Sequence, residues 1–310
     1  MRQALALCSR AEEPSSGPAG EPTLDPAAAI RAILAAPDDE LDYAMAKLAL
    51  DRIVDPSIDV EAVAAELDRM AEIARELAGS GAADGGKLAA LRRLIYEAGA
   101  WNDNRPFGYD HSDPLGQDIR AKLISVYLAT RLGNCVSMPI LLLVLAEKLG
   151  LDMALALAPL HMFVRFREEG GRILNLEATS GAHPARDEWY RRNMPMSQRA
   201  LANGIYLRPL SRRQAIAHIA GTVVEHLIGE GCYHEAIEAS TAILDHFPTD
   251  VYAMVKQGTA YGHLLQAENY ARYPMPSLIP PPLRPRSRIL AERNRALFEA
   301  AEALGWEPVE

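Results

Sequence analysis

The sequence predicts an α+β protein with a helical N-terminal part, a core in which a buried helix packs on a small antiparallel sheet, and a helical C-terminal part. Three observations lead to this fold class. Most of the chain repeats apolar residues every three or four positions, as amphipathic helices do. One helical segment near the middle is apolar on all sides, which is typical of a helix surrounded by other elements. Three short segments with period-two character follow it directly, and these are typical of neighbouring strands.

The composition limits the function classes that fit the chain. The 310 residues are 49% apolar and 24% charged, which is ordinary for a globular protein. The 32 Lys and Arg against 41 Asp and Glu give a net charge of -9, which repels phosphate backbones and acidic lipid surfaces. The longest apolar run falls well short of the ~20 residues that span a bilayer. We therefore expect no nucleic-acid partner and no membrane partner.

The cysteines indicate the compartment. Cys8, Cys135 and Cys232 are odd in number, far apart and without a CxxC pair, so neither a disulfide framework nor a four-ligand zinc site follows. We therefore expect a cytoplasmic protein. The apolar stretch before Cys8 is short, and Leu7 stands where a lipoprotein signal needs a small residue, so we expect no signal peptide.

The N-terminal half begins with a loose tail. Residues 1–24 are rich in Pro, Gly, Ser and Glu and bury too little apolar surface to offset the cost of ordering them. Residues 25–100 then form the expected N-terminal helical domain, with four amphipathic segments that start at Asp or Pro and end at Gly. Turn formers and aromatic rings fill the loop that follows, "WNDNRPFGYDHSDP", and such a loop can line a site.

Residues 101–210 form the expected core. An amphipathic helix, "LGQDIRAKLISVYLATRLG", ends at Gly133, and Asn134 can cap a second helix that begins at Cys135. This second helix is the one that is apolar all round. The three strand-like segments after it are "DMALALA", "HMFVRFR" and "RILNLEA", and the turn-like "EEGG" joins the last two, which predicts an antiparallel sheet.

Residues 211–310 form the expected C-terminal helical domain. In "GEGCYHEAIEASTAILDHFPTD" the glycine, the aromatic residue, the small residues and the closing proline stand where the second helix of a tetratricopeptide unit has them, at positions that include Gly231, Tyr233, Ala236 and Ala242. Paired helices with small residues pack closely and leave a groove. We therefore expect these helices to bind a protein or peptide partner.

Three residues of the core are candidates for thiol chemistry, which needs a thiolate, a base and a group that orients the base. Cys135 begins a helix, where unpaired backbone N–H groups favour negative charge. His161 opens a strand and Glu177 ends the next one. If these strands are antiparallel neighbours, the two residues lie within reach of a carboxylate–imidazole bond.

Considered alone, each of these three residues also fits a purely structural role. Cys135 is then a small core residue, His161 a strand-edge histidine and Glu177 a solvated strand end. Their spacing specifies no metal, and we expect neither a metal nor a cofactor. His111 and His183, both in loops, are either solvated or part of a substrate cleft.

The motifs "GNCVSMPILLLVLAEKLGL", "HMFVRF" and "NLEATSG" resemble, in order and spacing, the transglutaminase-like superfamily. More narrowly, residues 90–265 are similar to the bacterial Sir-B-type transglutaminase-like proteins with a C-terminal tetratricopeptide tail. The resemblance implies a papain-like core with Cys135 as nucleophile, His161 as base and Glu177 as orienting acid. Asn134 and Thr179 would support them. Glu177 replaces the more usual aspartate, and Phe163 replaces a frequent tryptophan.

The resemblance implies a cysteine amidohydrolase, peptidase or acyltransferase that acts on a protein or peptide substrate through a thioester. The Cys135 backbone N–H would be one oxyanion donor, with Asn134, Tyr127 and Gln117 as candidates for the second. The alternative is a catalytically silent scaffold of the same fold that acts as a regulatory adaptor through its tetratricopeptide helices, because one fold hosts active and inactive members.

Overall fold

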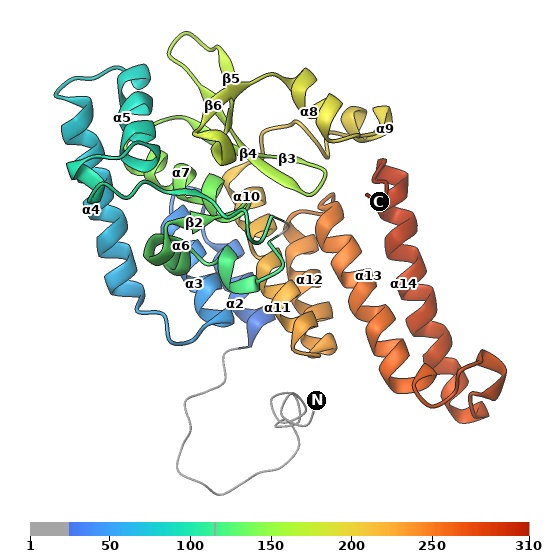
Figure 1. Ribbon diagram of the computed structural model, residues 1–310. Coiled ribbons are helices and arrows are strands. Elements are labelled where there is room, and N and C mark those ends of the chain that lie inside the picture. Colours follow the sequence, from blue (N-terminus) through green and yellow to red (C-terminus); the bar gives the residue numbers. More distant parts are fainter. Residues whose placement is uncertain (1–24, 115, 310) are drawn as a thin grey trace, which may run out of the picture. The chain divides into compact units, whose positions relative to one another are not determined.

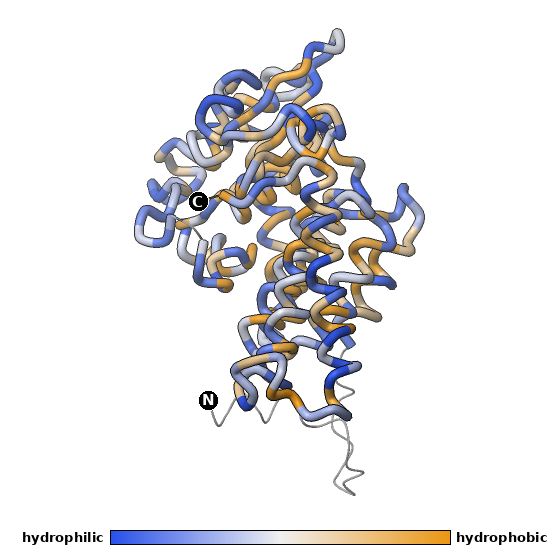
Figure 2. Tube along the Cα trace, turned by 90° about the vertical axis from the view of Figure 1, so that its right-hand side faces the viewer, coloured by the Kyte–Doolittle hydropathy of each residue, from blue (hydrophilic) through white to orange (hydrophobic). Residues whose placement is uncertain are grey.

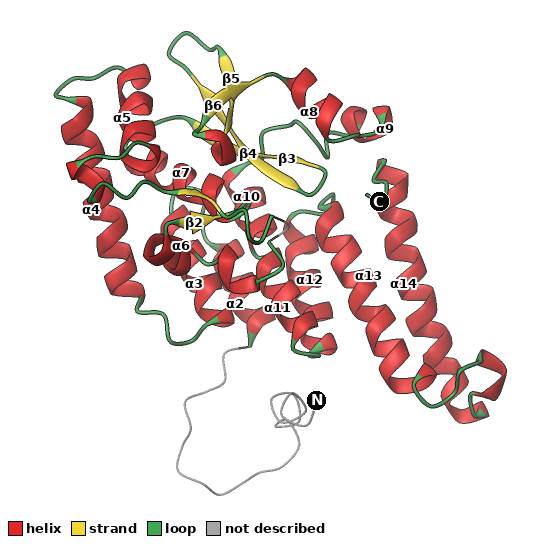
Figure 3. Cartoon of the chain, in the orientation of Figure 1, coloured by secondary structure: helices red, strands yellow, loops and turns green. Residues whose placement is uncertain are grey.

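The computed structural model describes residues 25–114 and 116–309. Helices make up most of it and strands form two small sheets (Figure 3), so the chain has the α+β composition that the sequence predicts. The loose tail expected at residues 1–24 lies outside the described residues. The contacts divide the described chain into two compact units, residues 36–216 with 307–309 and residues 25–35 with 217–306.

The first helices of the larger unit lie close to the positions that the sequence pattern predicts. Asp42 caps α3 by accepting a hydrogen bond from the Met45 backbone N–H, and Asp59 caps α4 in the same way through Ala62. Gly79 ends α4 with a φ of 83°, in the left-handed region that favours glycine. The helices of this unit that precede the sheet are α3 (Tyr43–Val54), α4 (Val60–Ala78), α5 (Asp84–Tyr96), α6 (Ile124–Thr130) and α7 (Ser137–Lys148).

Helix α7 lies at the centre of the larger unit. Its residues from Ser137 to Ala146 are all buried, and it contacts α3, α4, α5 and α6 as well as the sheet. The helix begins at Ser137, two residues later than the sequence predicts. The reason is local: the Asn134 side chain folds back onto the backbone N–H groups of Val136 and Ser137 and forms a turn there.

The main sheet has the strand order β3-β4-β5-β6 with every pair antiparallel. The predicted turn between its second and third strands carries Gly170 and Gly171, both with positive φ. The fourth strand lies in a stretch that the sequence pattern leaves unassigned. The strands are β3 (Met153–Ala158), β4 (His161–Arg167), β5 (Ile173–Glu177) and β6 (His183–Ala185), and α7 packs on β3 and β4 (Figure 1).

The segment before α7 differs from its prediction. Instead of one long helix ending at Gly133, it contains a short 3-10 turn (Ile119–Lys122), α6, and the strand β2 (Leu132–Gly133), which pairs in parallel with β1 (Gly108–Tyr109). A buried ion pair accounts for the break. Asp51 bonds both Lys47 Nζ and the Ile124 backbone N–H, while Lys47 Nζ also donates to the Lys122 carbonyl. These bonds hold the chain at residues 122–124 in a non-helical path.

After the sheet, the larger unit continues through α8 (Asp187–Asn193) and α9 (Gln198–Ala202) into α10 (Arg212–Ile219), and the boundary between the units falls inside α10.

The smaller unit is helical. Helix α2 (Pro26–Ala35) contacts α12. The other helices of this unit pack in chain order, each against its neighbour in sequence: α11 (Gly221–Gly229), α12 (Tyr233–His246), α13 (Val251–Leu265) and α14 (Arg284–Leu304). Apolar and polar stretches alternate along the helices in Figure 2, as expected for helices with one buried face. Ala236 and Ala242 are fully buried, and the ring of Tyr233 stacks on His263 at 5.3 Å.

The contacts group the chain differently from the expected ranges. Helix α2 belongs with the C-terminal helices, and the helices between 43 and 96 belong with the core, although the sequence pattern puts both in one N-terminal domain. Hydrophobic periodicity marks an amphipathic helix but does not say which other helix covers its apolar face. Among residues 25–114 and 116–309, no helix combines the length and the apolar character needed to cross a bilayer.

Candidate active site

Cys135 is held between a strand and a helix. It follows β2 directly and lies in the turn that leads into α7. Gly133 is required here because a Cβ at this position would come 2.5 Å from Tyr127 Cε2 and 2.8 Å from Ser137 Oγ. The buried Asn134 accepts hydrogen bonds from Val136 N at 2.9 Å and from Ser137 N at 3.1 Å. The backbone on both sides of Cys135 is therefore fixed by packing.

The thiol of Cys135 has two polar neighbours. Its Sγ lies 3.7 Å from the Leu160 carbonyl oxygen, and the thiol is close enough to the His161 imidazole to raise the pKa of that ring. The Cys135 backbone N–H donates to no group within the described chain. This N–H lies beside the thiol in the turn that leads into α7, where the Asn134 carbonyl accepts a hydrogen bond from Met138 N at 3.1 Å. An unpaired donor at this place can bind an oxyanion.

His161 and Glu177 form the carboxylate–imidazole bond that antiparallel strands make possible. They lie at adjoining ends of β4 and β5 (Figure 1), and His161 Nε2 donates to Glu177 Oε2 at 2.8 Å. Burial by itself lowers the pKa of His161, but the hydrogen bonds to Cys135 and Glu177 and their negative charges outweigh it and raise that pKa to about 9. The imidazole is thus kept protonated near neutral pH.

Four donors surround the Glu177 carboxylate. Oε1 accepts from the Thr179 hydroxyl at 2.6 Å and from the Thr179 backbone N–H at 3.1 Å, and Oε2 accepts from the Tyr190 hydroxyl at 3.0 Å as well as from His161. Burial raises the pKa of Glu177, but the bonds and charge of His161 and the bonds from Thr179 outweigh it and lower the pKa. The carboxylate therefore stays ionised although it is buried.

Tyr190 is a site residue that the sequence pattern does not indicate. It comes from α8, its ring is fully buried, and it stacks on Phe163 with centroids 4.1 Å apart. Burial and the Glu177 charge raise the pKa of Tyr190, so its hydroxyl remains a donor. The only signal in the sequence is an aromatic pair, "EWY", shortly after Glu177, and nothing in it predicts a fold back onto the carboxylate.

A cavity of 250 Å³ opens beside these groups. Cys135, His161 and Thr179 contribute its polar wall, and the rest of the lining is Tyr109, Pro114, Pro159, Leu160, Trp189 and Met194. Tyr109 comes from the aromatic loop that the sequence suggested as a site wall. Leu160 and Trp189 were not singled out from the sequence.

The other sequence candidates have different surroundings. Tyr127 is fully buried and its hydroxyl has no partner in the described part of the chain. Gln117 is exposed, with its backbone N–H bonded to Asp113. Neither Tyr127, Gln117 nor Asn134 lines the cavity.

The two histidines expected in loops lie outside the cavity lining, and His183 begins β6 instead of lying in a loop, because it pairs with Glu177 of β5. His183 is exposed and lies against Arg92, whose Nη2 is 2.8 Å from His183 Nδ1. His111 is exposed and its ring meets that of Tyr109 edge-on. Within residues 25–114 and 116–309, no group of three or more His, Cys, Asp or Glu side chains is arranged to hold a metal ion.

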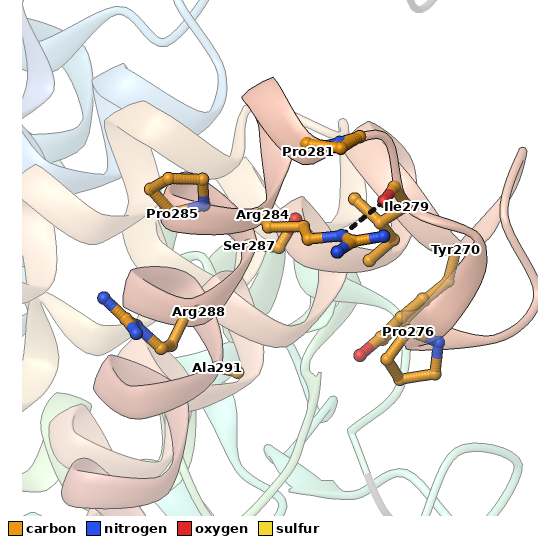
Figure 4. Close-up of a pocket in the computed structure, with 9 residues that line it drawn as sticks. All are labelled: Tyr270, Pro276, Ile279, Pro281, Arg284, Pro285, Ser287, Arg288 and Ala291. Atoms are coloured by element: carbon orange, nitrogen blue, oxygen red, sulfur yellow. Dashed lines mark hydrogen bonds between the residues drawn. The ribbon is translucent and has the colours of Figure 1, made fainter.

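A larger cavity of 440 Å³ lies in the smaller unit, between the Pro-rich segment at residues 273–283 and the start of α14. Figure 4 shows that Arg284, which lines it, donates from Nε to the Ile279 carbonyl at 2.8 Å. Its lining contains Arg, Pro, Ser, Tyr and aliphatic residues but no cysteine, histidine or carboxylate. The described residues that line this cavity therefore offer no thiol and no imidazole or carboxylate base.

Comparison with known proteins identifies one relationship. A family model described as "Transglutaminase-like superfamily" matches residues 61–221, just over half of the chain. The match includes Cys135, His161, Glu177 and Tyr190. No curated protein and no solved structure matches the chain significantly.

Proposed function

Because the chain belongs to the transglutaminase-like superfamily, we propose that it is a cysteine acyl-transfer enzyme, an amidohydrolase, peptidase or acyltransferase acting on a protein or peptide amide. Cys135 is the nucleophile, His161 the acid and base, and Glu177 the group that orients His161. Asn134 holds the turn on which Cys135 stands, and Thr179 and Tyr190 hold the carboxylate. We propose that it works in the cytoplasm, because its three cysteines are far apart and without a CxxC pair, and that it is of the bacterial Sir-B type that residues 90–265 resemble.

The hydrogen bond between His161 Nε2 and Glu177 Oε2 is the observation that carries this proposal. It occupies one ring nitrogen and leaves Nδ1 for the thiol of Cys135. A histidine whose pKa is raised to about 9 stores the proton of the thiol as imidazolium. A cysteine that only fills space in a core does not require a protonated histidine beside its thiol.

The proposed reaction proceeds in two stages. The Cys135 thiolate attacks the amide carbonyl carbon and forms the C–S bond, and the carbonyl oxygen takes the negative charge next to the free Cys135 N–H. His161 gives its proton to the leaving nitrogen, the C–N bond breaks, and an amine departs from the thioester. His161 then removes a proton from water or a second amine, which attacks the thioester; the C–S bond breaks, the acyl product departs, and the Cys135 thiolate and His161 imidazolium are restored.

Alkylation of Cys135 tests the proposal before a substrate is known. A paired thiolate reacts with iodoacetamide well below the ~8.5 at which an ordinary thiol titrates. Labelling from about pH 5 to about pH 9, read on the Cys135 peptide by mass spectrometry, should show fast reaction near neutral pH in the parent, and His161→Ala should move the reaction to higher pH. Protection of Cys135 from alkylation at every pH would refute the enzymatic role. The same conclusion would follow if the pH profile of alkylation were the same in the parent and in His161→Ala.

The second candidate function is an adaptor with the same fold but without catalysis. Features of the smaller unit favour a tetratricopeptide-like arrangement: Gly231 has a φ of 79° in the turn between α11 and α12, and the small residues Ala236 and Ala242 are fully buried between helices. In this alternative the helices bind a protein or peptide segment. Capture of one specific partner by Cys135→Ala and parent protein alike, together with an unreactive Cys135, would favour it.

A further inference from the structure

The cavity beside Cys135 has polar groups at the reacting atoms and apolar side chains around them. Six of its nine lining residues offer hydrocarbon or aromatic surface, and no Asp, Glu, Lys or Arg is among the described residues that line it. Leu160 and Trp189 are 71% and 44% exposed, although large apolar side chains normally lie inside a folded unit. Both flank the thiol: Leu160 precedes His161, and its own carbonyl lies 3.7 Å from Cys135 Sγ.

Trp189 is held in position rather than projecting freely. Its ring meets the ring of Tyr190 edge-on at a centroid distance of 5.1 Å, and Tyr190 in turn is stacked on Phe163 and bonded to Glu177. The indole therefore forms a rigid wall whose place is tied to that of the reacting groups.

We propose that the acyl donor is a peptide whose residue at the attacked carbonyl carries an aromatic or long aliphatic side chain, which packs against Trp189, Leu160 and Met194. This inference rests on the proposed acyl-transfer function and adds its substrate class. The side chain would cover apolar surface that water now contacts, and that burial is the source of selectivity.

Size and charge both favour such a donor. At 250 Å³ the cavity is smaller than the ~300–1,000 Å³ of small-molecule sites, so it suits one side chain of a longer chain that continues outside. An acidic side chain would lose water without gaining a cationic partner other than the imidazolium. Besides burial, the charges of Asp113 and Asp110 raise the pKa of Tyr109, so both carboxylates lie near this cavity wall and would repel an acidic side chain.

Chloromethyl ketones of N-acetylated amino acids test this inference, because the Cys135 thiolate displaces chloride and forms a stable C–S bond without any turnover. The Phe, Leu, Gly and Glu reagents are compared by the rate of Cys135 modification, each divided by the iodoacetamide rate of the same protein. We expect Phe and Leu to exceed Glu by about tenfold or more. Trp189→Ala and Leu160→Ala should each reduce that ratio several-fold.

Ile173→Ala is the matched control. Ile173 is as exposed as Trp189, at 44%, and lies at the end of β5 away from Glu177, so its loss should leave the ratio unchanged. Equal rates for Phe and Glu, or a ratio unaffected by Trp189→Ala and Leu160→Ala, would overturn the substrate class while iodoacetamide reactivity stays intact. A Cys135 that resists iodoacetamide as well would instead overturn the proposed function and this inference with it.

Discussion

The chain contains two buried histidine–carboxylate pairs that look alike in isolation. His161 Nε2 lies 2.8 Å from Glu177 Oε2 in the larger unit, and His218 Nδ1 lies 2.8 Å from Asp250 Oδ2 in the smaller one. Side-chain exposures are 9% and 6% for the first pair and 10% and 1% for the second. Distance and burial alone therefore do not distinguish a reactive pair from a structural one.

The surroundings make the difference. The other carboxylate oxygen of Asp250 accepts hydrogen bonds from the backbone N–H groups of Tyr252 and Ala253. Asp250 therefore caps α13, which is a structural role. Glu177 is bonded by Thr179 and Tyr190 side chains at a cavity, and its histidine reaches a thiol. The comparison teaches that a third group and an open space, rather than the pair itself, define a site.

The largest expected effect comes from removing each histidine in turn. His161→Ala should lower the hydrolysis of an N-acetylphenylalanine anilide by about 10³-fold or more, because both the thiolate and the proton for the leaving amine are lost. His218→Ala should leave that rate within a factor of two of the parent and lower the melting temperature instead. Rates come from released aniline and stability from circular dichroism. Equal losses of activity in both variants would mean that the first pair is no more catalytic than the second.

The next effect separates the two carboxylates. Glu177→Gln should keep the fold and lower the hydrolysis rate by about 10²–10⁴-fold, since an amide accepts a hydrogen bond but stabilises imidazolium poorly. Asp250→Ala should cost about 1–3 kcal/mol of unfolding free energy through the lost cap and an unpaired His218, with little change in rate. Urea unfolding and the anilide assay measure both. A Glu177→Gln protein that unfolds, or that is as active as the parent, would show Glu177 to be structural.

A smaller effect concerns the pH dependence. The parent should lose activity as pH rises through about 9, where His161 gives up the proton needed by the leaving amine. In Tyr190→Phe the Glu177 carboxylate loses one donor and attracts the imidazolium proton more strongly, so this alkaline limb should move to higher pH. Thr179→Val should act in the same direction because its hydroxyl bonds the other oxygen at 2.6 Å. A limb that moves to lower pH, or stays in place, would contradict the role of Tyr190.

The smallest effect is on stability. Because the pKa of His161 is raised in the folded protein, its contribution is complete below the ~6.5 of an ordinary histidine and is lost as pH rises through about 9. The pKa of Glu177 is lowered, so its contribution is present above ~4.3 and is lost at acid pH. The melting temperature of the parent should thus fall between about pH 6.5 and about pH 9 by more than that of His161→Ala. Parallel profiles would show that the pair does not stabilise the fold.

Sequence periodicity predicted much of the fold because it is local. The segments for β3, β4 and β5, the helix α13 and the all-apolar helix α7 lie where the pattern puts them, within two residues. The long helix expected before Gly133 was wrong, because the bonds of Asp51 and Lys47, from a distant helix, hold residues 122–124 out of a helical path. No pattern in a neighbouring stretch could have revealed that interruption.

The sequence by itself predicted that a buried helix would begin near Cys135, that His161 would open a strand and that Glu177 would end the next one. Alternation and turn chemistry are properties of a few consecutive residues. Only the tertiary structure decided that Tyr190 bonds Glu177, that Trp189 and Leu160 wall the cavity, and that the Cys135 N–H stays unpaired within the described chain. Such contacts join elements far apart in the chain, and side-chain packing in three dimensions selects them without leaving a periodic trace in the sequence.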